Sequence, residues 1–159
     1  MGDEPSADGE ENPGDETLAK NVQDMLDYLE EQMTSGKDIG IDFTEIESML
    51  AGARIIMESG DYAGAIDLIN DCMQKASKRF SDYKMLLISI KKAETDIQAA
   101  HNTGKDVSEA GRRLKMARLH LEKGDYKLGV DTAKHAIEAL SEVPKPSEAA
   151  WGSGLSDSE

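Results

Sequence analysis

The tripeptide Gly-Asp-Tyr occupies residues 60–62 and returns unchanged at residues 124–126, sixty-four residues further along the chain. With that offset, residues 40–77 align with residues 104–141, and about a third of the aligned residues are identical. Self-similarity at a fixed period is typical of chains that are built from small stacked units. The sequence therefore predicts two related units in tandem.

Each copy of the tripeptide lies between two segments with helical periodicity. A glycine such as Gly60 can adopt the left-handed conformation that closes a helix. Asp61 and Asp125 can then cap the next helix through their side-chain oxygens, and the tyrosine can staple the turn. The motif is thus interpreted as the end of one helix and the cap of the next, and not as a ligand site.

Apolar residues recur at steps of three and four and predict five helices. The expected segments are 15–35, which Gly36 stops, then 42–59, then about forty residues from Asp61, then 106–123, and finally 125–142 before Pro144. Capping boxes are expected where Asp42 is followed by Glu45, and where Asp106 is followed by Glu109. A sustained three-four spacing favours helices that pack nearly parallel.

The third segment is expected to be one long helix. It contains no proline, and no glycine occurs between Gly64 and Gly104. Its expected buried positions alternate between two series, one through Ile69 and Tyr83 and the other through Phe80 and Leu87. A break near residues 77–81 is the alternative, and it would give six helices in place of five.

The fold class is therefore all-α: two tandem antiparallel three-helix bundles that share a long central helix, elongated overall. The first three-helix unit is assigned to residues 16–80 and the second to 81–142. Glycines at Gly52, Gly64, Gly111 and Gly129 lie inside expected helices, where each costs about 1 kcal/mol relative to alanine. These glycines either allow neighbouring helices to approach closely or leave the helical hairpins flexible for partner binding.

The net charge of −14 is concentrated at the ends of the chain. Residues 1–16 hold seven acidic side chains and no Lys or Arg, and all four prolines lie in the two end segments. We expect residues 1–15 and 143–159 to be disordered tails. An acidic chain without a basic stripe repels phosphates, so nucleic-acid binding is disfavoured.

Few residues match the patterns of catalytic or metal-binding sites. No apolar run is long enough to cross a bilayer, and the N-terminus lacks the regions of a signal peptide, so a cytoplasmic protein is expected. Cys72 is expected to be a small buried hydrophobe. Of the histidines, His101 falls on the apolar face and His120 is expected to face solvent, and none has zinc-ligand spacing. We expect no catalytic residues, no metal and no cofactor.

The C-terminal segment contains the only tryptophan, Trp151, with Leu155 four residues later. A large aromatic in a polar tail is typical of an anchor for a pocket on another protein. Trp151 and Leu155 are therefore the predicted partner-binding residues. Packing of Trp151 against its own helices is the alternative. The methionines, including Met85, are expected to pack in the core.

The hairpins around the two tripeptides, in residues 43–77 and 107–144, resemble the turn of tetratricopeptide repeats, where Gly-Asp-Tyr-like residues and then a small residue join paired helices. They are also similar to the turn of the three-helix microtubule-interacting-and-transport type. Either resemblance implies binding of a protein partner through helix faces, and neither implies catalysis.

The leading hypothesis is a non-enzymatic protein–protein interaction or scaffold module built from helical repeats. A self-associating structural rod is the alternative, and small-ligand binding between the bundles is the weaker alternative. The partner's identity and the oligomeric state stay open, with a monomer favoured.

Overall fold

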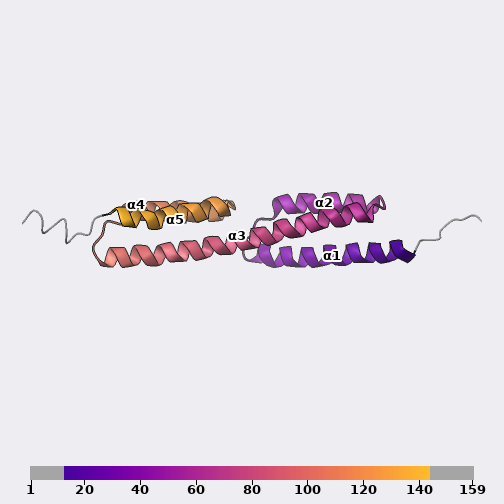
Figure 1. Ribbon diagram of the computed structural model, residues 1–159, viewed down its shortest axis with the longest axis horizontal. Helices are drawn as coiled ribbons and strands as arrows, with labels where there is room; N and C mark the ends of the chain where they lie inside the picture. Colours follow the sequence, from indigo (N-terminus) through magenta and orange to yellow (C-terminus); the bar gives the residue numbers. More distant parts are fainter. Residues whose placement is uncertain (1–12, 144–159) are drawn as a thin grey trace, which may run out of the picture. The chain divides into compact units, whose positions relative to one another are not determined.

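The computed structural model describes residues 13–143, and all regular structure in that part of the chain is α-helical. The five helices are α1 (Pro13–Asp38), α2 (Thr44–Glu58), α3 (Tyr62–Asn102), α4 (Ser108–Lys123) and α5 (Tyr126–Glu142), as Figure 1 shows. The all-α class and the five-helix count are therefore confirmed within these residues.

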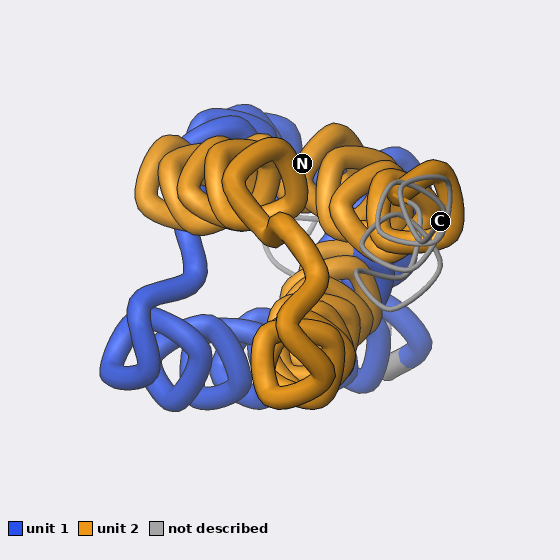
Figure 2. Tube along the Cα trace, turned by 90° about the vertical axis from the view of Figure 1, so that its left-hand side faces the viewer, with its two compact units in different colours: residues 1–78 blue, residues 79–159 orange. Residues whose placement is uncertain are grey.

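Helix α3 runs unbroken for 41 residues, which excludes the alternative break near residues 77–81. The chain divides into two compact units, residues 1–78 and 79–159, coloured separately in Figure 2. The division falls inside α3, between Lys78 and Arg79, two residues before the boundary expected from the sequence.

In the first unit, α1, α2 and the beginning of α3 lie side by side (Figures 1 and 2). The Nζ atom of Lys75 on α3 donates to Glu45 on α2 at 2.8 Å, and Gly52 of α2 lies close to Leu68 of α3. The core between them consists mostly of large aliphatic side chains: Val22, Leu26, Leu29, Met33, Ile41, Phe43, Ile46, Leu50 and Ile69, with Ala53, Ala65, Cys72 and Ala76.

The second unit has a core of smaller side chains. Helices α4 and α5 pack together, and Arg118 of α4 pairs with Glu94 of α3. Six of the buried residues are alanines: Ala93, Ala110, Ala117, Ala133, Ala136 and Ala139. Because interaxial distance depends on the side chains at the contact, alanines let helices approach closely. This unit is therefore packed with less tolerance for added volume.

Four glycines in the described residues have a positive φ, and they form two pairs separated by sixty-four residues: Gly40 with Gly104, and Gly60 with Gly124. Each closes a helix with the same two bonds. At the end of α2, for example, the N–H of Gly60 donates to the carbonyl of Met57, and the N–H of Asp61 donates to that of Ile56. A residue with a Cβ is strained in this left-handed conformation.

The expected stop of the first helix at Gly36 is wrong. Helix α1 continues to Asp38, and the left-handed residue is Gly40. The N–H of Gly40 donates to the carbonyl of Lys37 and that of Ile41 to the carbonyl of Gly36, with the Ile41 side chain buried. Gly36 is thus inside the closing turn, and its carbonyl accepts the bond that ends the helix.

The two tripeptides differ in their caps. Asp61 caps α3 as expected, because its Oδ1 accepts the N–H of Gly64 at 2.9 Å. The expected cap from Asp125 is wrong, since its side chain makes no capping hydrogen bond. Instead the guanidinium of Arg79 donates to the carbonyl of Gly124 at 2.9 Å and holds this turn from α3.

The expected capping boxes have altered partners. Asp42 Oδ1 accepts the N–H of Thr44 at 3.0 Å, and Asp106 Oδ1 accepts that of Ser108 at 2.9 Å. These bonds, again sixty-four residues apart, hold the first turns of α2 and α4. The carboxylate of Glu109 accepts from Arg112 and Arg113, which lie one turn further along α4.

One of the buried positions expected in α3, Leu87, is wrong, whereas Phe80 of the same series is half-buried. Ile69 is fully buried as expected and Tyr83 is half-buried, but Leu87 is 42 % exposed whereas Leu86 is fully buried. The strongly buried positions Ala65, Cys72 and Leu86 lie one residue before the expected large residues Ile66, Met73 and Leu87. A helix between two neighbours buries the middle of its apolar face most deeply. In α3 that middle holds the small residues Ala65 and Cys72 together with the larger Ile69 and Leu86.

The internal glycines do not share one explanation. A Cβ at Gly111 meets nothing within 4 Å, and one at Gly52 makes ordinary contact with Leu68. A Cβ at Gly129 lies 2.7 Å from a methyl of Leu86 and 3.2 Å from the Cβ of His120. Close helix approach therefore accounts for Gly129 and does not account for Gly52 or Gly111.

Candidate functional site

The two residues predicted to bind a partner, Trp151 and Leu155, lie outside the described residues, so their role stays a prediction. Three surfaces of the described residues are candidates for binding: a cleft between α1 and α2, a groove between α3 and α5, and an exposed apolar ridge on α3. They differ in charge and in apolar content.

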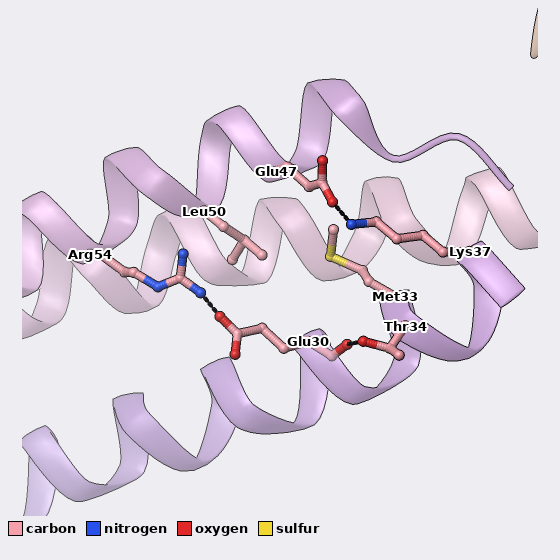
Figure 3. A pocket seen from close by; sticks show the side chains of 7 residues that line it. All are labelled: Glu30, Met33, Thr34, Lys37, Glu47, Leu50 and Arg54. Atoms are coloured by element: carbon pink, nitrogen blue, oxygen red, sulfur yellow. Dashed lines mark hydrogen bonds and ion pairs between the residues drawn. The ribbon is translucent and has the colours of Figure 1, made fainter.

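The cleft between α1 and α2 has a volume of about 260 Å³ (Figure 3). Its lining residues are Glu30, Met33, Thr34, Lys37, Glu47, Leu50 and Arg54. Met33 and Leu50 form its apolar wall and are 3 % and 2 % exposed. Little apolar surface is therefore accessible in this cleft.

Two ion pairs cross the cleft from α1 to α2. Lys37 pairs with Glu47, and Glu30 pairs with Arg54 (Figure 3). All four side chains are roughly half-exposed, so each pair contributes at most about 1 kcal/mol to stability. The charges of the cleft are matched within the protein, which favours a role in setting the register of the hairpin over a role in binding.

The groove between α3 and α5 lies within the second unit and has a volume of about 440 Å³. It is lined by Asp96, Ala99, Ala100, Thr103, Lys105, Ile137, Leu140 and Ser141. Leu140 and its buried neighbours Ala110 and Ala139 form a small apolar cluster against which Ala100 packs. At the rim, Lys105 Nζ donates to the carbonyl of Leu140 at 3.2 Å. This groove combines an apolar floor with a rim that carries one charge of each sign, Lys105 and Asp96.

The third surface is on α3, where Met85 and Ile88 are 50 % and 55 % exposed. Residues three apart are neighbours on a helix, so the two side chains form one ridge, called here the Met85–Ile88 ridge. The other neighbours of Ile88, at steps of minus four, three and four, are Lys84, Lys91 and Lys92. An apolar ridge with a basic border thus occurs in a chain of net charge −14.

The expectation that Met85 packs in the core is wrong, and sequence reasoning missed the ridge. The signal was present in the run Met-Leu-Leu-Ile at residues 85–88. Successive helical residues are separated by about 100°, so four in a row surround the helix. One buried face cannot cover all four.

The structure places the titratable residues His101, His120 and Cys72 differently from one another. The expectation that His120 faces solvent is wrong: its Nδ1 is buried and has no hydrogen-bond partner among the described residues. His101, expected on the apolar face, is exposed. Cys72 is fully buried as expected, and desolvation raises the pKa of its thiol. Residues 13–143 contain no group of three His, Cys, Asp or Glu side chains that could hold a metal ion.

The most perturbed carboxylate is Glu109 in the first turn of α4. Hydrogen bonds from Arg112 and Arg113 lower its pKa to about 2. The same bonds raise the pKa of Arg112. All three residues lie on neighbouring turns of α4 with their side chains partly exposed, so the shift reflects local ion pairing and not an enclosed site.

Among the helices described, none is long and apolar enough to cross a membrane. Comparison with protein-family models, with curated proteins and with solved structures finds no match to this chain.

Proposed function

We propose that this protein is a non-enzymatic protein–protein interaction module that acts as a scaffold and is built from two related helical hairpins. The observation that carries the proposal is the Met85–Ile88 ridge. Single exposed apolar side chains are common on proteins. Adjacent exposed apolar side chains form contiguous apolar surface, which marks interaction sites more often than isolated side chains do.

The border of the ridge specifies the partner's chemistry. Lys84, Lys91 and Lys92 adjoin Ile88, and Lys92 Nζ also binds Asp96 at 2.9 Å. Complementary charge increases the rate of association and suppresses wrong partners. The surface fits an acidic amphipathic segment that places an apolar side chain between Met85 and Ile88 and carboxylates over the lysines.

The hairpins support a repeated architecture for the scaffold. Helices α2 and α4 begin sixty-four residues apart, as do the second helices of the two hairpins at Tyr62 and Tyr126. The left-handed glycines and the Asp42 and Asp106 turns follow the same offset. This agreement supports helical repeats of the tetratricopeptide-like kind expected from the sequence.

A photo-crosslinking amino acid at Met85 tests the proposal in cells that express the protein. We expect one protein to be crosslinked and the yield to fall at least several-fold when Ile88 is replaced by Glu. A probe at Gln98, which is exposed on the same helix, is the matched control. Equal yields at the two positions, or a yield that Ile88→Glu does not change, would contradict the proposed surface.

The molecular mass in solution distinguishes self-association through the same ridge from binding of a different protein. Light scattering coupled to chromatography should give a monomer mass at all concentrations. If a dimer is found and Ile88→Glu converts it to a monomer, the ridge joins copies of this chain and the structural-rod alternative replaces the scaffold.

A further inference from the structure

We propose that the groove between α3 and α5 binds the chain's own C-terminal segment, with the indole of Trp151 on Ile137 and Leu140. This inference goes beyond the proposed function, because it concerns a different surface from the Met85–Ile88 ridge. It selects one occupant for the groove and gives Trp151 an intramolecular role.

The groove suits a large flat aromatic ring. Its volume is about 440 Å³, and its wall on α5 is formed by Ile137, which is half-buried, and Leu140, which is 7 % exposed. The opposite wall on α3 is formed by small side chains, Ala99 and Ala100. Alanines leave room that a Trp side chain can fill, and burial of an aromatic ring contributes strongly to binding.

The connection to the groove is short. Helix α5 ends at Glu142, one residue after the lining residue Ser141, and Trp151 follows nine residues after the helix end. An extended segment of that length reaches about 30 Å, so Trp151 can return along α5 to Ile137. A short tether also gives an effective concentration in the millimolar range, so a weak contact suffices.

The composition of the segment agrees with this placement. Within residues 144–159, Trp151 and Leu155 are the large apolar side chains, and three acidic residues outnumber the single lysine. The rim of the groove carries Lys105 and Asp96, one charge of each sign. The apolar floor is therefore what the segment would recognise, and docking would leave its charged residues toward solvent. Any partner of this groove would then have to displace the segment first.

The test uses Trp151 as its own reporter, since the 159-residue sequence has one tryptophan. We expect its fluorescence to be blue-shifted relative to the urea-denatured chain and several-fold less sensitive to acrylamide quenching. Replacing the exposed groove residue Ala99 with Glu should abolish both effects, while circular dichroism reports an unchanged helix content. Gln98→Glu, one residue away and outside the groove, is the matched control and should leave both effects in place.

A dilution series distinguishes the chain's own segment from the segment of a second copy as the occupant of the groove. An intramolecular contact gives a blue shift that does not depend on protein concentration, whereas a segment donated by a second copy gives one that disappears on dilution. A native emission equal to that of the denatured chain would overturn the inference, as would a blue shift that survives Ala99→Glu. None of these outcomes depends on the Met85 crosslink, so the inference and the proposed function fail separately.

Discussion

The guanidinium of Arg79 lies 4.2 Å from the centroid of the Tyr126 ring, and the same side chain donates a hydrogen bond to the carbonyl of Gly124. Tyr83 meets the Tyr126 ring edge-on at 5.4 Å. Tyr126 is 2 % exposed, so these contacts are largely shielded from water. One arginine of α3 thus holds both the first residue of α5 and the turn before it.

Replacing Arg79 with Ala should lower the free energy of unfolding by about 2 kcal/mol, because a shielded cation–π contact and a charge-assisted hydrogen bond are lost together. Urea unfolding followed by circular dichroism measures the change. Lys78→Ala, on the exposed neighbouring residue, is the control and should change stability by less than about 0.5 kcal/mol. Equal effects of the two substitutions would show that the Arg79 contacts contribute nothing to stability.

Alanine substitutions at two helical glycines of the second unit should have opposite effects. Gly111→Ala should raise the free energy of unfolding by up to about 1 kcal/mol, because the added Cβ meets open space and the unfolded chain loses freedom. Gly129→Ala should lower it by about 1–3 kcal/mol, since Leu86 and His120 must move to admit the Cβ. Chemical denaturation of both variants measures this difference in sign, and stabilisation by Gly129→Ala would refute the close approach of α5 to α3.

The buried Nδ1 of His120 lowers the free energy of unfolding, and an apolar side chain at this position would remove that loss. In the aligned first unit the corresponding residue is Ile56, which is half-buried. His120→Ile should therefore raise the free energy of unfolding by about 1 kcal/mol, because a buried polar atom without a partner is eliminated. Thermal and urea unfolding measure the change, with the exposed His135→Ile as the control. A clear loss of stability would indicate that a water molecule satisfies Nδ1 in solution.

Glu109 should make a pH-dependent contribution to stability. Its pKa falls from 4.5 to about 2 in the folded protein, so the ion pairs with Arg112 and Arg113 stabilise the fold above pH 4.5. That contribution is lost as the pH falls toward 2, where the folded state also takes up the proton. Glu109→Gln should lower the melting temperature slightly at neutral pH and have a much smaller effect near pH 2. Because the Glu109 side chain is about half-exposed, salt should reduce the difference. Glu122→Gln on the same helix is the control.

The helices themselves could be predicted because the signals for them are local. A glycine such as Gly60 can take a left-handed φ without strain, and Asp61 caps the helix that begins one residue later. The same local rules failed at Gly36, because whether a glycine closes a helix depends on which carbonyls the next residues can reach. They failed again at Asp125, where Arg79, forty-six residues away in sequence, holds the turn instead.

The candidate surfaces were harder to predict. The pattern in α3 favours large apolar residues such as Leu87, but the neighbouring helices bury Leu86 and leave Leu87, Met85 and Ile88 accessible. Periodicity reports how apolar residues are spaced, and it does not report which direction a neighbouring helix approaches from. The border of lysines around Ile88 follows from the spacing once that residue is known to be exposed.

The amino-acid sequence by itself determined the all-α class of residues 13–143 and the turns that recur after sixty-four residues, because caps and left-handed glycines act within a few residues. The tertiary structure decided which face of each helix is buried, that Gly129 is a point of close approach, and that Nδ1 of His120 is enclosed. Those outcomes depend on contacts between residues far apart in the chain, and their energies are set by the distance between packed helices.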